Sequence, residues 1–335
     1  MRLHRTPQWQ RKPLKRKVVV VGAGTAGLTC AARLKELGAE VIVFEKSRGV
    51  SGRMASRRME HGFCDHGAQY FTARSDGFLS LVLHWQALGL VTPWNARIAR
   101  IGFSDESPVR ESQRFIGVPR MTSPMAMLAE GLDVRLNTRI SKIERMPVGW
   151  SVTDESGETC ATEIDQIVLA IPPAQALHLL GAHSPAWREQ LAAVRMAPCW
   201  TVMATVRETD QTGFDAAFVA NGPLAWVANN ATKPGRTPLP VWTLHASAEW
   251  STQHIDRSGE AVSQELIQAF EGIASVKVIE SVSHRWLYAR AVDETRCGPL
   301  WDPSMGLAAC GDWTMGDNVE AAWRSGLECA DRVSQ

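Results

Sequence analysis

Four consecutive valines that run into a glycine-rich turn place the strongest constraint on the fold of this chain. Residues 18–21 are followed by Gly22-Ala23-Gly24-Thr25-Ala26-Gly27, which has the spacing G-x-G-x-x-G. In a strand–turn–helix unit, Gly22 permits the tight turn, Gly24 leaves room for a pyrophosphate, and Gly27 lets the helix pack closely on the sheet. The free N–H groups of the first helical turn then face the phosphates. The motif therefore predicts a dinucleotide-binding βαβ unit.

The residues after this motif continue the same pattern. Apolar residues recur near the helical period up to a stop at Gly38, and they are Ala26, Ala31, Leu34 and Leu37. A second strand, residues 41–44, ends at Glu45, which lies 18 residues after Gly27. A carboxylate at this distance is expected to accept a hydrogen bond from a ribose 2′-hydroxyl and to repel a 2′-phosphate.

Two further segments, far along the chain, suit other parts of the same cofactor. Residues 167–172 read Ile-Val-Leu-Ala-Ile-Pro, and residues 306–312 read Gly-Leu-Ala-Ala-Cys-Gly-Asp. The order of the three segments is that of a two-domain FAD enzyme. A terminal helix with Asp317 or Asn318 as its N-cap is predicted to follow, and its macrodipole would stabilise negative charge on a reduced flavin.

A glycine- and arginine-rich loop, residues 46–54, can bring backbone N–H groups and a guanidinium to a cofactor phosphate, although a solvated surface loop is the alternative. Cys310 lies on a predicted buried strand and is not expected to be attached to the flavin, so the predicted cofactor is non-covalent FAD. The predicted cofactor-binding residues are Gly22, Gly24, Thr25, Ala26, Gly27, Glu45, Lys46, Arg48, Gly52, Arg53, Met54, Gln69, Tyr70, Gly311, Asp312, Asn318 and Val319.

Composition is typical of a globular chain with one unusual end. The 335 residues suffice for two domains, and no apolar run approaches the roughly 20 residues that span a bilayer. Residues 1–17 carry seven basic side chains and no acid. Such a tail can bind nucleic acid or a membrane surface, but it lacks amphipathic spacing and the apolar core of a signal peptide. We expect a disordered tail over residues 1–16, with no nucleic acid, membrane or obligate protein partner.

The seven cysteines and nine histidines give no pattern of a metal site. The cysteines form no C-x-x-C pair and are odd in number, which favours a reducing, cytoplasmic compartment. No H-x-x-x-H or H-E-x-x-H spacing is present, so no metal is predicted. A G-x-S-x-G nucleophile elbow is also missing, which leaves nucleophilic hydrolysis without support.

The middle of the chain predicts a second domain. A helix is expected over residues 76–88 with Phe78, Leu81, Val82 and Trp85 facing inward. Strands over 199–207, 216–220, 224–229, 241–246 and 282–288 are separated by turn-rich loops, which favours an antiparallel sheet. The predicted fold class is α/β: a discontinuous Rossmann-like FAD-binding domain, residues 17–74, 131–174 and 291–335, with an α+β substrate domain built on an antiparallel sheet, residues 75–130 and 175–290.

Taken in order, these segments resemble the bacterial renalases, a branch of the flavin amine-oxidase superfamily. The pieces that carry the resemblance are residues 45–49, 52–54, 67–74 (GAQYFTAR), 233–236 (KPGR), 244–246, 284–290 (HRWLYAR) and 311–313, of which GAQYF and HRWxYAR are the more specific. The resemblance implies a flavoprotein oxidase that takes hydride from the mis-reduced 2-dihydro isomer of NAD(P)H and passes the electrons to O2, giving NAD(P)+ and hydrogen peroxide. The chain departs from the family at Ser51, Cys64, Asn318 and Ala321.

Hydride transfer from a dihydropyridine needs orientation of the ring more than acid–base chemistry. Four aromatic residues are candidates for stacking on the substrate, with core packing as the favoured alternative for any single one, and they are Tyr70, Trp226, Trp286 and Tyr288. His245 is the candidate partner for the nicotinamide carboxamide, with a structural role as the alternative.

Two other classes of function remain open. An amine or polyamine oxidase resembles this fold but usually has a lysine near the flavin and an aromatic cage. Here only Lys233 and Lys277 lie beyond Lys142, and two tyrosines make a paired-tyrosine cage difficult. A non-catalytic flavin-binding module would bind FAD and be reduced by no donor.

Overall fold

The computed structural model describes residues 15–60, 62–104, 112–181, 183–207, 212–238, 240–292 and 297–335. Nearly all of the predicted disordered tail therefore lies outside the described residues. Within the described part of the chain, no helix is both long and apolar enough to cross a membrane.

A six-stranded sheet is built around the valine run. Its strand order is β18-β19-β12-β1-β2-β8, and the ranges are β1 Lys17–Val21, β2 Glu40–Phe44, β8 Asp133–Arg135, β12 Gln166–Leu169, β18 Leu300–Asp302 and β19 Leu307–Ala309. All pairs are parallel except β18 with β19. The valines of β1 are buried on both faces, as a central parallel strand requires.

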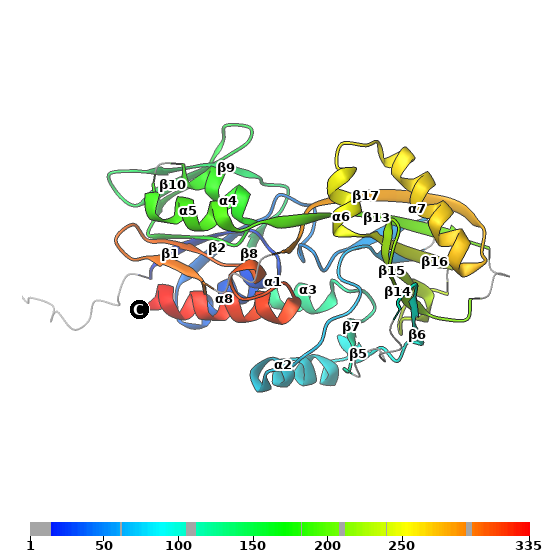
Figure 1. Ribbon diagram of the computed structural model, residues 1–335. Helices are drawn as coiled ribbons and strands as arrows, with labels where there is room; N and C mark the ends of the chain where they lie inside the picture. Colours follow the sequence, from blue (N-terminus) through cyan, green and yellow to red (C-terminus); the bar gives the residue numbers. More distant parts are fainter. Residues whose placement is uncertain are drawn as a thin grey trace, which may run out of the picture.

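Each face of this sheet is covered by a different layer (Figure 1). Val18 and Val20 pack with helices α1 (Thr25–Glu36) and α8 (Val319–Ser334). Val19 and Val21 pack with a second layer of strands and helices, whose members are β9 Ile140–Arg145, β10 Trp150–Asp154, β11 Thr159–Ile164, α4 Pro173–Leu180 and α5 Pro185–Ala193. The mixed α/β fold and the βαβ unit are as predicted, and α1 ends at Glu36, so that Leu37 follows the helix and is 46% exposed.

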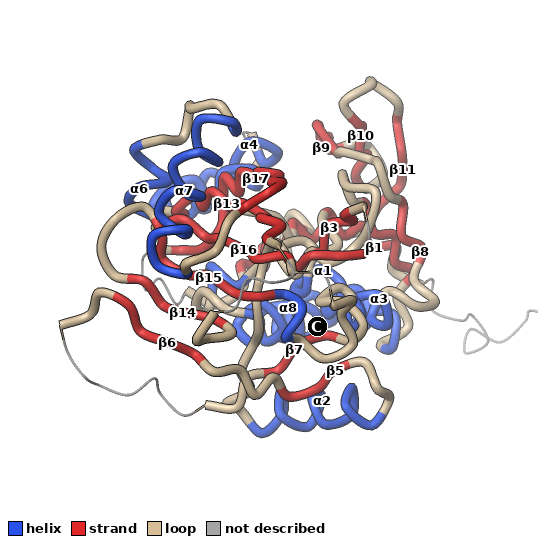
Figure 2. The backbone as a smooth tube through the Cα atoms, turned by 90° about the vertical axis from the view of Figure 1, so that its right-hand side faces the viewer, coloured by secondary structure: helices blue, strands red, loops and turns tan. Residues whose placement is uncertain are grey.

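A second six-stranded sheet has the order β17-β13-β16-β15-β14-β6. Its strands are β6 Ile98–Ile101, β13 Met196–Val206, β14 Ala216–Val219, β15 Leu224–Asn229, β16 Val241–Ala246 and β17 Val278–Ala291. Helices α6 (Ala248–Gln253) and α7 (Gly259–Ala274) cover its outer face. The predicted antiparallel sheet is confirmed, with one addition: β6 joins the edge parallel to β14. Figure 2 shows this sheet on one side of β1 and the β9–β11 sheet on the other.

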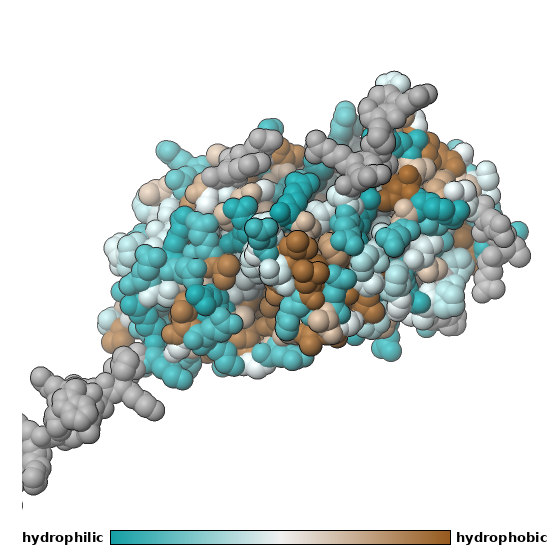
Figure 3. Space-filling view, turned by 90° about the horizontal axis from the view of Figure 1, so that it is seen from below, coloured by the Kyte–Doolittle hydropathy of each residue, from teal (hydrophilic) through white to brown (hydrophobic). Residues whose placement is uncertain are grey.

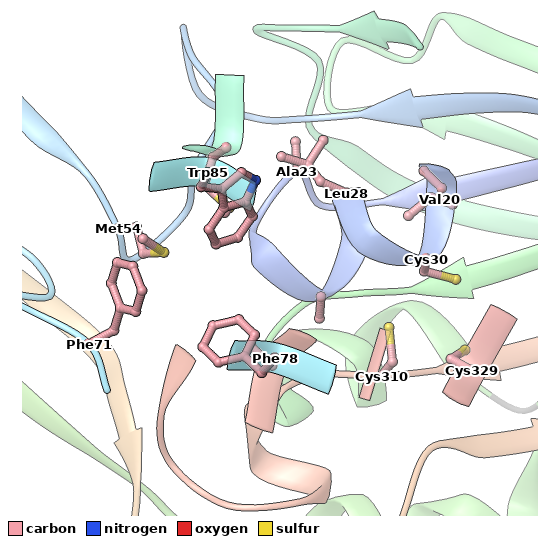
Figure 4. Close-up of a cluster of buried hydrophobic side chains, with 14 of the residues drawn as sticks. Val20, Ala23, Leu28, Cys30, Met54, Phe71, Phe78, Trp85, Cys310 and Cys329 are labelled. Atoms are coloured by element: carbon pink, nitrogen blue, oxygen red, sulfur yellow. The ribbon is translucent and has the colours of Figure 1, made fainter. Parts of the chain in front are cut away.

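Short elements connect the two sheets. They are β3 Ser56–Met59, β4 Gly62–Asp65, α2 Asp76–Ala87, β5 Val91–Pro93, β7 Phe115–Gly117, α3 Ser123–Leu128 and the 3-10 turns η2 Asn230–Thr232 and η3 Asp312–Thr314. On α2, Phe78, Val82 and Trp85 are fully buried, as predicted. They belong to the same hydrophobic cluster as α1 and α8 (Figure 4). The predicted division into two domains stays a prediction, because this cluster includes residues from both sides of the expected boundary.

The outer face of α2 differs from its inner face. Leu79 and Leu83 are exposed there, and Leu88 follows the helix with half of its surface exposed. Seen from below, apolar side chains gather near the centre of the molecule among hydrophilic ones (Figure 3).

Candidate active site

A cavity of about 2240 Å³ lies between the two large sheets. One wall is formed where the parallel strands end, by the residues that follow β1, β2, β12 and β19. The opposite wall comes from β13 to β17 of the antiparallel sheet. Ligands of open α/β sheets bind at the carboxyl ends of the strands, so this is the expected place for a cofactor.

The glycine-rich turn has the three properties that the sequence predicts. Gly22 has φ +106°, and a Cβ at Gly27 would lie 1.9 Å from the carbonyl oxygen of Gly22. A Cβ at Gly24 would meet only the Cα of Gly52, at 3.9 Å. The backbone is therefore accessible from the cavity at Gly24, and the helix packs tightly behind it at Gly27.

Glu45 connects the end of β2 to this turn. Its side chain is buried, with one carboxylate oxygen accepting from the backbone N–H of Ala23 at 2.8 Å and the other from Ser47 at 2.9 Å. Each oxygen keeps a second lone pair, which is what a ribose hydroxyl would need. The carboxylate thus stabilises the turn as well as offering an acceptor to a ligand.

Arg53 is engaged within the protein. Its guanidinium forms a two-pronged ion pair with Asp312, with Nη1 at 2.8 Å from Oδ2, and Nη1 also donates to the carbonyl oxygen of Ala289 at 3.0 Å. Asp312 neutralises the charge of the Arg53 guanidinium, which the sequence predicted to lie near a cofactor phosphate. Arg53 therefore joins the 46–54 loop to η3 and β17, and the unpaired N–H groups of α1 remain available to a pyrophosphate.

The N-terminus of α8 also reaches the cavity. Asn318 is its N-cap, as one of the two predictions had it, and the side-chain oxygen accepts from the N–H of Ala321 at 2.9 Å. Both Asn318 and Val319 line the cavity. A 16-residue helix directed at this point places the positive end of its macrodipole there.

These features together fit FAD. The accessible Gly24, the buried acceptor Glu45 and the two helix N-termini match the pyrophosphate, the ribose and the developing negative charge of the flavin. The cavity-lining cysteine, Cys199, is a poor nucleophile, because burial raises the pKa of its thiol to about 11. Cys310 is buried away from the cavity beside Cys30 and Cys329 (Figure 4). All seven cysteines are free, and the described residues hold no cluster suited to a metal ion.

One row of cross-strand neighbours forms the opposite wall. His284 pairs with Thr201, Thr201 with His245, His245 with Trp226, and Trp226 with Phe218. Directly paired residues project from the same face of a sheet. Four of these five side chains therefore line the cavity, and Thr201 is buried between the two histidines.

A histidine group occupies one corner of the cavity. The backbone oxygen of His66 accepts from Nε1 of Trp286 at 3.1 Å and lies 3.2 Å from Nε2 of His245. The His66 ring stacks on Trp286 and meets His284 edge-on, with centroids 5.1 Å and 4.9 Å apart. Burial, together with the neighbouring His284 and Arg57, lowers the pKa of His66 to about 3, and burial lowers the pKa of His245 to about 4. These rings are therefore neutral at pH 7.

The structure brings almost all of the predicted site residues together. His245, Tyr70, Trp226, Trp286 and Tyr288 line the cavity, as does every predicted cofactor-binding residue except Gly27. Sequence reasoning missed His66, His284, Phe218 and Arg57. His66 directly precedes the 67–74 segment and His284 is the first residue of the 284–290 segment, both of which the sequence singled out. The placement of His284 and Phe218 depends on strand register, which the sequence does not reveal.

Comparisons with known proteins agree with this geometry. Residues 20–82 match the model of an NAD(P)-binding Rossmann-like domain, and residues 84–334 match that of the flavin containing amine oxidoreductases. A putrescine oxidase from Kocuria rosea is 39% identical over 154 residues, which is 46% of this chain and 30% of that protein. A zeta-carotene-forming phytoene desaturase from Myxococcus xanthus is 52% identical over 48 residues, 14% of this chain and 9% of that protein. These alignments span less than a third of either relative.

Solved structures share the fold over the whole chain. A candidate protoporphyrinogen oxidase from Exiguobacterium sp. 255-15 has a TM-score of 0.73 at 14% identity and covers 96% of this chain and 99% of its own. A redesigned putrescine oxidase has a TM-score of 0.69 at 14% identity and covers 95% and 98%. At such identities the likeness concerns the fold alone.

Proposed function

This chain belongs to the flavin containing amine oxidoreductases, and from that premise we propose that it is an FAD-dependent oxidase of isomeric (2-dihydro) NAD(P)H. FAD, when bound, accepts a hydride and hands the electrons to O2, which yields hydrogen peroxide. The contribution of the protein is to admit the substrate, to orient its ring and to exclude competing donors.

The charge of the cavity wall carries this proposal. Nine cationic residues line it, namely Lys46, Arg48, Arg53, Arg57, Arg58, Arg120, Arg139, Arg285 and Arg290, against Glu45, Asp312 and Asp317. The guanidinium of Arg285 donates to the carbonyl oxygen of Ile255 and lies over the Trp200 ring, so this side chain is not counted toward the charge of the cavity. Arg53 and Arg139 are paired with Asp312 and Glu155, yet a large positive excess remains. A substrate with phosphates is attracted into such a cavity, whereas a protonated amine is repelled.

His245 is suited to orient a carboxamide. A carbonyl oxygen only accepts, so the contact with His66 requires the proton of the neutral ring on Nε2. Nδ1 is then an acceptor, the partner that a carboxamide N–H₂ group needs. Because the low pKa of His245 keeps the ring neutral, this acceptor is present throughout the physiological pH range.

The aromatic side chains supply a surface for the ring. Tyr70 and Trp226 lie 5.6 Å apart between centroids, and Trp226 meets Phe218 edge-on at 4.7 Å. A dihydropyridine gives up hydride without losing a proton first, so a wall of aromatics and neutral histidines suffices. An amine must instead lose a proton before oxidation, and the positive charge of the wall works against its entry.

The alternative is an amine or polyamine oxidase, which the partial match to putrescine oxidase favours. Anaerobic stopped-flow mixing separates the two. We expect the flavin absorbance to bleach fastest with the 2-dihydro isomers, and slowly with ordinary 4-dihydro NADH, benzylamine, putrescine and spermine. Faster bleaching by an amine would establish the alternative, and no bleaching by any donor would indicate a non-catalytic flavin-binding module.

His245→Ala tests the orienting role. Flavin reduction by the 2-dihydro isomer should slow about tenfold or more, since a small displacement of the reacting atom is costly. FAD content should stay unchanged. His84→Ala, a change on the surface helix α2, serves as the control and should leave both quantities as in the wild type.

A further inference from the structure

Three charged side chains are completely enclosed behind the cavity wall. Asp65 ends β4, and Lys233 and Arg236 belong to the KPGR turn that follows η2. Their side chains are 0%, 0% and 1% exposed. The turn is one of the segments that carry the family resemblance, and it has no role in the proposed hydride transfer itself.

Asp65 receives both cations on one carboxylate oxygen. Oδ2 accepts from Nζ of Lys233 at 3.2 Å and from Nη2 and Nε of Arg236 at 2.7 and 3.2 Å. Burial alone would raise the pKa of Asp65, but the charges of Lys233 and Arg236 outweigh it and lower the pKa to about 2. The carboxylate is therefore ionised, and it faces two cations.

Lys233 also contacts Gln69 and Trp94. Nζ donates to the side-chain oxygen of Gln69 at 3.1 Å and lies 5.4 Å from the centre of the Trp94 ring. Burial lowers the pKa of Lys233, while the neighbouring Asp65 opposes that shift. A fully buried amine is expensive unless its hydrogen bonds are satisfied, and here each contact has a defined partner.

The contact with Lys233 fixes the amide of Gln69 in one orientation. The side-chain nitrogen donates to the carbonyl oxygens of Asp65 at 2.7 Å and Gly67 at 3.1 Å. A flipped amide would place N–H₂ against the ammonium and oxygen against two carbonyls. Gln69 lines the cavity, whereas Lys233 does not.

The segment held in this way, residues 65–70, carries the proposed substrate contacts. The backbone oxygen of His66 is the common acceptor for His245 and Trp286. The ring of Tyr70 lies against Trp226 and Trp94, with centroids 5.6 and 6.4 Å apart. Release of Gln69 would therefore disturb several contacts at once.

We propose that Lys233 is a positioning residue, which acts on the active site by holding Gln69 and with it the 65–70 segment. This inference rests on the proposed function for the reaction that it serves. Lys233 touches neither cofactor nor substrate in this account. It differs in this respect from the lysine that amine oxidases usually have near the flavin.

A double-mutant cycle tests the action through Gln69. Lys233→Met and Gln69→Leu should each slow anaerobic flavin reduction by the 2-dihydro isomer about tenfold or more. The double variant should be no slower than either single one, because both changes break the same contact. Lys233→Arg, which keeps the charge and the donors, should recover part of the rate. Lys142→Met, at a surface site on β9, is the control.

A second measurement does not depend on turnover. Hydrogen exchange of the holoenzyme should speed up over residues 65–70 in Lys233→Met and Gln69→Leu and stay unchanged elsewhere, and the FAD content of Lys233→Met should equal that of the wild type. If no dihydronicotinamide reduces even the wild type, the proposed function fails while this exchange pattern still supports Lys233. Wild-type exchange in Lys233→Met, additive losses in the double variant, or loss of folding that Gln69→Leu does not share would each overturn the proposal.

Discussion

Glu45 shows how one carboxylate can serve the turn and the ligand together. Its two oxygens accept hydrogen bonds from the N–H groups of Ala23 and Ser47, and the residue lines the cavity. Glu45→Ala should weaken FAD binding by about 1–3 kcal/mol, the range of a lost hydrogen bond to a charged group. Titration of apoprotein with FAD, followed by flavin fluorescence, measures this change. An affinity equal to that of the wild type would mean that the ribose does not use this carboxylate.

The neutral histidines predict a pH dependence of stability. The pKa values of His66, about 3, and His245, about 4, lie below the ordinary value of 6.5, and burial also lowers the pKa of His284. Protons therefore bind preferentially to the unfolded chain, so the contribution of these residues is complete above pH 6.5 and declines as the pH falls toward 4. Asp65 titrates only below this window, since its pKa is about 2.

Urea unfolding of the holoprotein between pH 7 and pH 4 measures that decline. His66→Gln should flatten the pH dependence, because it removes one of the groups that resists protonation. His84→Gln, on the surface of α2, should leave the dependence unchanged. Stability that stays constant from pH 7 to pH 5 would contradict the prediction.

At the level of single residues, the sequence predicted what local spacing determines. The turn glycines, Glu45 and the Asn318 cap follow from fixed distances along the chain. Lys233 could not be placed, because its neighbours Asp65 and Gln69 lie more than 160 residues away. The ion pair of Arg53 with Asp312 could not be predicted either, because the two residues are 259 positions apart, and Arg53 was therefore predicted to lie near a phosphate.

Among the elements, α1 and α8 approach each other unusually closely. A Cβ at Gly326 of α8 would lie 2.2 Å from the carbonyl oxygen of Ala26. Gly326→Ala should therefore destabilise the protein by about 1–3 kcal/mol and weaken FAD binding, because the first turn of α1 must move. Gly272→Ala is the matched control: Gly272 is also helical but has no neighbour within 4 Å, so it should gain up to about 1 kcal/mol. Thermal unfolding and FAD titration read out both.

A comparison of two N-caps separates the contribution of α8 to FAD binding from its contribution to stability. Asn318 and Ser258 each cap a 16-residue helix, but only Asn318 lines the cavity. Replacement of either by alanine should cost about 0.5–2 kcal/mol in unfolding free energy. Only Asn318→Ala should also weaken FAD binding. Equal FAD affinity in the two variants would exclude a contribution from this helix end.

The sequence predicted the elements whose periodicity is strong, but it gave no prediction for α4 to α7 or for β9 to β11. The βαβ unit, α2, α8 and the strands of the antiparallel sheet all follow from patterns of apolar residues. It missed β6, a four-residue strand whose burial shows no alternation and which pairs with β14 across more than 110 residues. Short edge strands of this kind are defined by their partner, so their own residues say little about them.

For the molecule as a whole, the cavity depends on the way the two sheets face each other. The sequence predicted one sheet for the cofactor and one for the substrate, but it gave no register for the second. That register aligns His284, Thr201, His245 and Trp226 in a single row. The same arrangement brings arginines from β3 and β17 to the cavity, and the resulting excess of positive charge follows only from the assembled fold.

That excess charge leads to a prediction about salt. Screening at high ionic strength shortens the reach of exposed charges, with a Debye length of roughly 10 Å at 0.1 M and 3 Å at 1 M. The KM for the 2-dihydro isomer of NAD(P)H should therefore rise roughly several-fold as salt increases over this range, while kcat changes little. The matched control is the same isomer of dihydronicotinamide riboside, which has no phosphate and should be insensitive to salt. Equal salt dependence for both compounds would show that the arginines act on the fold or the cofactor and not on substrate phosphates.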